Sequence, residues 1–110
     1  MTFSQGDIVL LPFPMADLSG TKVRPAIIIS NAKVNNTQDV IVAQITSNIR
    51  NDDFSFILED SILTSSLNKL SEVRCHKILT VTKAIIKKKI SSVKPEYIKE
   101  LINKVKSIYD

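Results

Sequence analysis

The stretch GDIVLLPFPMADLSGTKVRPAIIIS, residues 6–30, decides the fold. Two apolar runs, IVLL and AIII, flank a polar insert. The first run predicts a strand over residues 6–13 with both faces apolar, as in a small barrel or a covered sheet. Pro12 and Pro14 are expected to end this strand, because proline cannot donate to a ladder.

The second run predicts a strand over residues 23–30, which opens on Arg24 and Pro25 after a loop over residues 14–22. An arginine beside a buried strand has its guanidinium carried by a rigid scaffold, and the loop lies opposite it. This arrangement suits the binding of a phosphate or a carboxylate.

The rest of the chain alternates short strands with polar connections. Strands are predicted over residues 39–46, 54–58, 72–81 (with Val73, Cys75, Leu79 and Val81 on one face) and 85–93. The lysines of the last strand favour an edge position. One helical turn is expected within residues 31–38 and another within 59–70.

Pro95 is expected to start a C-terminal amphipathic helix, at the position where proline is tolerated. Its apolar stripe is predicted to pack on the sheet and consists of Ile98, Leu101, Ile102, Val105, Ile108 and Tyr109. The fold class is therefore mainly β with α: a small, strongly curved sheet or partly closed barrel with a C-terminal amphipathic helix.

Composition sets the outer limits. The chain has 110 residues, 44% of them hydrophobic, which predicts one domain over residues 1–110 with a real core. One cysteine makes no internal disulfide, and neither a signal peptide nor a membrane span is recognisable, so we expect the cytoplasm.

Residues 69–110 carry eleven Lys/Arg and four Asp/Glu, a net charge of +7, against −3 for residues 1–68. This asymmetry permits an anionic partner, and it equally fits a solvated lysine face.

The common catalytic motifs are absent from the sequence. It has no glycine-rich phosphate loop, no CxxC pair, no nucleophile elbow and a single histidine, His76. A lone histidine does not build a metal site, so neither a metal nor another cofactor is expected. What remains is a set of polar residues at strand ends: Arg24, Gln44, Thr46, Ser47, Arg74, His76 and Lys77.

Arg24 and Thr46 are the pair of greatest interest. Arg24 opens its strand and Thr46 closes the next one, so antiparallel pairing would place both at the same end of the sheet. A guanidinium beside a hydroxyl can hold one phosphate, with two donors from the fork and a third from the hydroxyl.

These segments together resemble the MazF/PemK family of toxin endoribonucleases. The resemblance is carried in order by GDIVLLPFP, RPAIIIS, VIVAQITSN and SEVRCHKILTVTK, from residue 6 to about residue 83. The helix after Pro95 fits the family's C-terminal helix. The resemblance implies an SH3-like barrel, a homodimer with RNA along its interface, and a cognate antitoxin that occupies the RNA groove. It also implies metal-independent cleavage of single-stranded mRNA at a short sequence, and it maps Arg24 and Thr46 onto the family's catalytic positions.

That mechanism agrees with the chemistry of the residues. RNA cleaves itself when its 2′-OH attacks the adjacent phosphorus, so the enzyme supplies charge stabilisation, here from Arg24 and Thr46. Arginine is always protonated and makes a poor base, whereas His76 titrates near neutrality. Other family members often have a carboxylate near this position, so a histidine here is a departure. We expect His76 to be a catalytic residue beside Arg24 and Thr46, with a modest contribution to proton transfer, and the alternative is a bystander. The substrate-binding candidates are Asp17, Ser19, Lys22, Gln44, Ser47, Asn48 and Lys77.

Other interpretations stay open at this stage. Arg24 could be a plain surface cation, Thr46 and Ser47 could be turn residues, and Lys87 to Lys89 could form a solvated edge. The same fold serves a toxin that poisons DNA gyrase, and a barrel that only binds nucleic acid is a third possibility. The pairing of Arg24 with Thr46 favours the nuclease, because a gyrase poison does not need it.

Overall fold

The computed structural model describes residues 2–15, 17 and 19–110. Its strands are β1 (Asp7–Pro14), β2 (Thr21–Ile28), β3 (Asp39–Thr46), β4 (Ser55–Leu58), β5 (Ser71–Thr82) and β6 (Lys88–Ser92). Its helices are α1 (Ala32–Asn35) and α2 (Pro95–Lys106), with 3-10 turns η1 (Asp60–Ile62) and η2 (Lys83–Ile85). Each strand expected from the sequence is present, and the two expected helical turns are α1 and η1.

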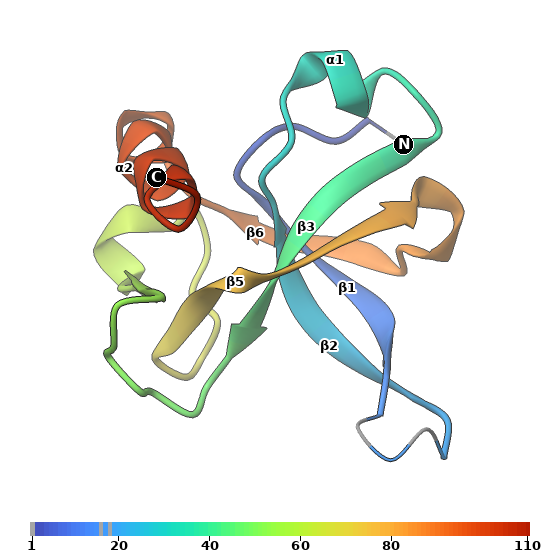
Figure 1. Ribbon diagram of the computed structural model, residues 1–110, viewed down its shortest axis with the longest axis horizontal. Helices are drawn as coiled ribbons and strands as arrows, with labels where there is room; N and C mark the ends of the chain where they lie inside the picture. The colour runs from blue at the N-terminus through green and yellow to red at the C-terminus, as the bar shows by residue number, and fades with distance from the viewer. Residues whose placement is uncertain (1, 16, 18) are drawn as a thin grey trace.

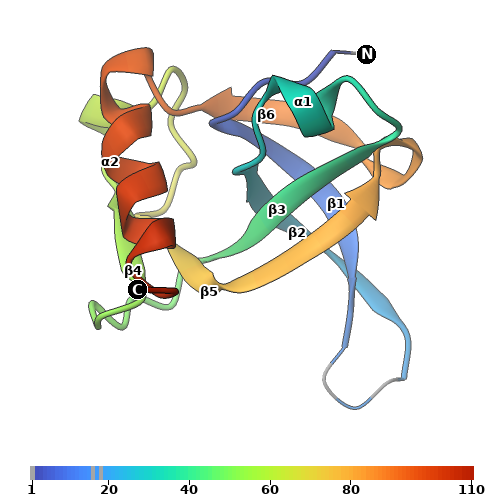
Figure 2. The ribbon, with the colours of Figure 1, turned by 45° about the horizontal axis from the view of Figure 1, so that its top comes forward.

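The six strands form one sheet in the order β4-β5-β3-β2-β1-β6, with antiparallel pairing throughout. The sheet is strongly twisted and α2 covers one side of it near β4 and β5, while the β1–β2 hairpin projects away (Figures 1 and 2). Within the described residues β4 and β6 do not pair, so the sheet is not closed. The prediction of a curved, mainly β fold with a C-terminal helix and an edge position for β6 is confirmed.

Alternating side chains of the central strands supply two apolar cores, one on each face of the sheet. Ile8, Ile27 and Ala43 belong to the core that α2 covers, whereas Val9 and Ile28 belong to the other core. The prediction that β1 is apolar on both faces is therefore confirmed. Burial on both sides fixes the register, because a slip by one residue would exchange the two sets of side chains.

The prolines of β1 do not end the strand where the sequence predicted. The pairing with β2 continues through Pro12, opposite Val23, to Pro14, opposite Thr21. The physical reason is that β6 pairs with β1 only as far as Leu10, which leaves one side of the later part of β1 as an edge. A proline without an N–H is tolerated in an edge position.

An irregularity in β5 changes which of its residues are buried. Ala43 of β3 is opposite Ile78, but its neighbour Gln44 is opposite Arg74, so residues 75–77 form a bulge. Cys75 is fully buried, as predicted, and burial raises the pKa of its thiol to about 11. The expectation that Leu79 and Val81 share the face of Val73 and Cys75 is wrong: Leu79 is 40% exposed, and Val81 packs in the core on the other side of the sheet. A bulge shifts the alternation of the residues that follow it.

The helix α2 begins at Pro95, as predicted, and packs against the sheet through Leu101 and Val105. Tyr109 was placed wrongly in the apolar stripe: it lies beyond the end of α2 and is 71% exposed. Gly6 suits its position because its φ of +95° favours glycine, and a Cβ there would lie 2.9 Å from Cδ1 of the Ile98 side chain of α2. Within the described ranges, no helix has the length and apolar character needed to cross a bilayer.

Candidate functional site

The ends of β2 and β3 separate at the position of Arg24 and Thr46. The two strands pair antiparallel from Ile28 opposite Val42 to Ala26 opposite Gln44, and the described pairing stops there. Arg24 lies two residues before Ala26 and Thr46 two residues after Gln44. The expectation that both lie at the same end of the sheet is confirmed, and an opening between the strands lies beside them.

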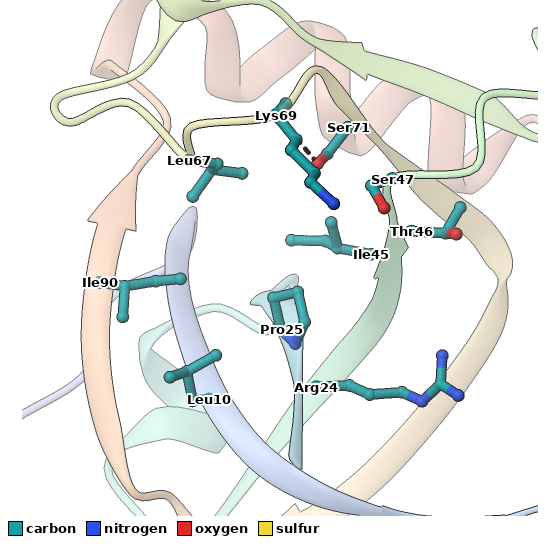
Figure 3. Close-up of a pocket in the computed structure, with 10 residues that line it drawn as sticks. All are labelled: Leu10, Arg24, Pro25, Ile45, Thr46, Ser47, Leu67, Lys69, Ser71 and Ile90. Carbon is teal, nitrogen blue, oxygen red and sulfur yellow. Dashed lines mark hydrogen bonds between the residues drawn. The ribbon is translucent and has the colours of Figure 1, made fainter. Parts of the chain in front are cut away.

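One hollow occupies this opening, and we call it the apolar hollow. It has a volume of about 320 Å³ and is lined by Leu10, Arg24, Pro25, Ile45, Thr46, Ser47, Leu67, Lys69, Ser71 and Ile90. Figure 3 shows apolar side chains around its centre, with the Lys69 ammonium directed inward and the Arg24 guanidinium extending away toward the side of Thr46. Its polar groups are therefore confined to part of the rim.

A second hollow adjoins the first, and we call it the cationic cleft. It has a volume of about 280 Å³ and is lined by Arg24, Gln44, Thr46, Asn48, Arg50, Arg74 and Lys77. Arg24 and Thr46 line both hollows. The described residues that line the two hollows include several cations but neither a carboxylate nor an imidazole. The electrostatic potential there is therefore positive and suits an anion.

The Arg74 side chain is neutralised inside the cleft wall by two carboxylates. Its Nη1 lies 2.9 Å from Oδ1 of Asp52 and 2.6 Å from Oε2 of Glu72, and its Nη2 donates to Oδ2 of Asp52 at 3.0 Å. These bonds, led by the one to Asp52, raise the pKa of Arg74 and hold the pKa of Asp52 well below its usual range. Of the polar residues that the sequence places at strand ends, Arg74 is therefore a structural cation.

Glu72 is the anchor of this cluster and is fully buried. Its Oε1 accepts the backbone N–H groups of Arg50 and Asn51, each at 3.0 Å, and its Oε2 accepts the Ser55 hydroxyl at 2.7 Å. Burial alone would raise the pKa of Glu72, but these hydrogen bonds and that from Arg74 outweigh it and bring the pKa to about 2. The cluster thus ties the segment carrying Asn48 and Arg50 to β5.

Arg24 contrasts with Arg74 because its guanidinium has no hydrogen bond or ion pair with any described residue. Arg24 is only partly exposed, and its backbone is paired with β1, opposite Leu11. A guanidinium that is carried on a strand, without a partner among the described residues, has the features of groups that bind anions in proteins.

Thr46 has a structural role as well as a place in the site. Its Oγ1 accepts the backbone N–H of Asn48 at 3.1 Å and so shapes the turn after β3. The hydroxyl proton of Thr46 remains available as a donor, because a hydroxyl donates one bond while accepting others. The interpretation of Thr46 as a turn residue is therefore correct and compatible with a role toward an anion.

His76 and Lys77 are neighbours in the bulge of β5, but their side chains have different surroundings. Lys77 lines the cationic cleft, whereas His76 is outside the lining of both hollows and its ring lies 4.4 Å from that of Phe54, centroid to centroid. Partial burial, followed by the charges of Arg74 and Lys77, lowers the pKa of His76. A role for His76 in proton transfer stays a prediction, and this position gives it no direct support.

The other predicted binding residues divide between the site and its surroundings. Gln44 and Asn48 line the cationic cleft, and Ser47 lines the apolar hollow. Asp17, Ser19 and Lys22 are exposed and line neither hollow. Asp17 accepts both the hydroxyl and the backbone N–H of Ser19, at 2.7 and 3.0 Å, which holds this part of the β1–β2 connection in a turn.

Two cations of the site were missed in the sequence. Arg50 lines the cationic cleft and Lys69 lines the apolar hollow. Arg50 follows Thr46 by four residues and Lys69 precedes β5 by two, so a search for cations in loops that adjoin Arg24 and Thr46 would have found both. The predicted lysine run of β6 is exposed, and Lys89 pairs with Asp7 at 3.2 Å. Among the described residues, no group of three or more His, Cys, Asp or Glu could hold a metal ion.

The family profile for the PemK-like, MazF-like toxins of type II toxin–antitoxin systems matches residues 4–109. This chain belongs to that family. The match spans the whole sheet, α2 and all residues that line the two hollows. A search of curated proteins finds no significant match.

Solved structures of this fold include toxins in complex with antitoxins. An endoribonuclease from a mycobacterial species, in complex with its cognate antitoxin, is 18% identical with a TM-score of 0.75, over 97% of this chain and 93% of that chain. A MazE–MazF crystal structure from Deinococcus radiodurans is 18% identical with a TM-score of 0.78, over 99% and 97%. The Mycobacterium tuberculosis toxin MazF-mt6 is 22% identical with a TM-score of 0.69, over 92% and 96%. Identities this low show a shared fold.

Proposed function

We propose that this toxin is an endoribonuclease that cleaves single-stranded RNA without a metal, at a short sequence. The observation that carries the proposal is the unpaired Arg24 guanidinium beside Thr46, in a cleft lined by further cations and by no described carboxylate. Similar folds described as endoribonucleases support the proposal.

The reaction that fits this site is an internal displacement at phosphorus. The 2′-oxygen forms a bond to the phosphorus as it loses its proton, and the bond from phosphorus to the 5′-oxygen breaks as that oxygen gains one. The products are a 2′,3′-cyclic phosphate and a 5′-OH. Arg24 and Thr46 donate hydrogen bonds to the non-bridging oxygens, whose charge grows in the transition state. Arg50 and Lys77 hold the flanking phosphates.

The whole chain, residues 1–110, is proposed to act as one toxin domain in a homodimer that a cognate antitoxin inhibits. A domain of this size has little surface with which to grip several nucleotides, and pairing doubles it. Light scattering at micromolar concentration measures the mass, and a monomeric mass with full activity would contradict the dimer.

The experiment is incubation of the purified toxin with a long single-stranded RNA in EDTA. We expect discrete fragments with cyclic-phosphate and 5′-OH ends, and no cut where the nucleotide 5′ to the broken bond is 2′-deoxy. Cleavage that stops in EDTA, or that continues at the 2′-deoxy position, contradicts the mechanism. Inhibition of DNA gyrase with RNA left intact would instead indicate the gyrase-poisoning class.

A further inference from the structure

We propose that the apolar hollow receives one nucleobase next to the phosphate that is attacked, and that Lys69 selects the edge of this base. This inference rests on the proposed function, because it names a subsite of the same RNA strand. It assigns to the hollow the specificity that the cationic cleft, lined by cations and amides, does not supply.

The chemistry of the hollow matches a base better than a phosphate. Five apolar side chains line it, Leu10, Pro25, Ile45, Leu67 and Ile90. A nucleobase has apolar faces and polar edges, whereas a phosphate is solvated on all sides and gains nothing from apolar walls. At about 320 Å³ the hollow is at the small end of small-molecule sites, which suits one base.

The polar groups of the hollow stand where the edge of a base would lie. Ser47, Lys69 and Ser71 are on the rim, and Figure 3 shows the Lys69 ammonium pointing inward. The Ser71 hydroxyl donates to the Lys69 carbonyl at 3.1 Å, which holds the backbone of this segment against β5. Glu59 and Asp60 share a neighbouring hollow with Lys69, but neither forms an ion pair with it.

An ammonium only donates hydrogen bonds, so Lys69 favours a base that presents acceptors. Guanine and uracil present a carbonyl oxygen, O6 or O4, at the position where adenine and cytosine carry an amino group, N6 or N4, which is a donor. The hollow therefore selects for guanine or uracil at one position.

The position of the apolar hollow indicates where along the RNA strand the bound base lies. Arg24 and Thr46 line both the hollow and the cleft, so a phosphate held by this pair is flanked by the hollow on one side and by the cations Arg50 and Lys77 on the other. The gap between β2 and β3 lets an unstacked base turn in while the backbone stays in the cleft. A base held this way is adjacent to the broken bond.

The first test compares the cleavage sites of the parent, Lys69→Met and Lys88→Met on a long mixed-sequence RNA in EDTA, by sequencing the new 5′-OH ends. Lys88 is an exposed lysine of β6 outside both hollows. Lys88→Met is therefore the control, because it removes the same charge without changing the apolar hollow. We expect the parent and Lys88→Met to prefer guanine or uracil at one position beside the cut. Loss of a charged hydrogen bond should reduce that preference roughly ten- to a hundredfold in Lys69→Met. An unchanged preference in Lys69→Met overturns the inference while the nuclease stands.

The second test does not need cleavage. The methyl NMR signals of Leu10, Ile45 and Ile90 are followed as GMP, UMP, CMP or inorganic phosphate is added. We expect shifts with GMP or UMP that are absent with phosphate alone and smaller in Lys69→Met. If the parent cuts no RNA, the proposed function fails, yet these shifts would still support a base subsite and their absence would overturn it.

A second copy of the chain over the apolar hollow is the competing occupant. A fall in the mass of Leu67→Trp by light scattering would show that this face is an interface between copies and would also overturn the inference.

Discussion

Arg24 and Arg74 both line the cationic cleft, one from β2 and the other from β5, and their surroundings are opposite. Arg74 is held by Asp52 and Glu72 and is largely buried, whereas Arg24 is partly exposed and has no partner among the described residues. Arg74 therefore stabilises the wall of the cleft, whereas Arg24 presents a charge without a partner among the described residues. The partners of a cation, more than its presence in a cleft, indicate whether it binds a ligand.

The largest effect is expected at the unpaired arginine. Arg24→Ala should lower the single-turnover rate of RNA cleavage about 1,000-fold, the upper end for loss of one oxyanion donor, and leave the urea midpoint of unfolding unchanged. Arg24→Lys should recover only part of the rate, because an ammonium does not reproduce a planar fork. Lys88→Ala is the control, an exposed cation of β6 outside both hollows. Cleavage by Arg24→Ala within a few-fold of the parent would place the site elsewhere.

Thr46 combines a structural role with a place in the site, because its hydroxyl oxygen also accepts a hydrogen bond in the turn after β3. Thr46→Val removes the donor and the acceptor and should reduce the rate about 100-fold, with a modest loss of stability from the freed N–H of Asn48. Thr46→Ser keeps both functions and should stay close to the parent. Equal rates for the valine and serine variants, measured in the same single-turnover assay, would show that the hydroxyl takes no part.

The paired arginine predicts an effect on stability. Glu72→Gln leaves part of a buried ionic cluster without its charge and should lower the free energy of unfolding by roughly 3–5 kcal/mol. Because the folded pKa of Glu72 is about 2, below its ordinary value of 4.5, this stabilisation is complete above pH 4.5 and is lost as the pH falls toward 2. Urea titrations between pH 2 and pH 7 should therefore show a flatter pH dependence for Glu72→Gln. The same slope in both proteins would contradict the role of this cluster.

The smallest effect is expected at His76, whose ring packs at a tilt against Phe54 outside both hollows. A general base contributes roughly 100- to 10,000-fold, whereas a bystander changes the rate by less than about threefold. We expect His76→Gln to keep the rate and the pH profile of the parent. An acid limb with an apparent pKa below 6.5 that is present in the parent and absent from the variant would instead identify His76 as the base.

Local patterns predicted the strands because each apolar run is short, bounded by turn residues and buried. They failed where the tertiary structure overrides them: Pro12 is tolerated because β6 ends early, and Leu79 is exposed because the bulge in β5 shifts the alternation. Antiparallel neighbours brought Arg24 and Thr46 together as expected. Of the two partners that neutralise Arg74, Glu72 lies two residues away on the same face of β5 and is visible in the sequence. Asp52 is not, because it lies 22 residues away and reaches Arg74 only when β4 pairs with β5.

The most direct measurement follows the side-chain Nε–Hε signals of the arginines by NMR while a single-stranded DNA oligonucleotide of mixed sequence is added. Such a strand lacks the 2′-OH and is not cut, and the chain has only Arg24, Arg50 and Arg74 to assign, by replacement with lysine. We expect a large shift for Arg24 and a signal for Arg74 that stays in place. A shift of Arg74 with Arg24 unmoved would contradict it.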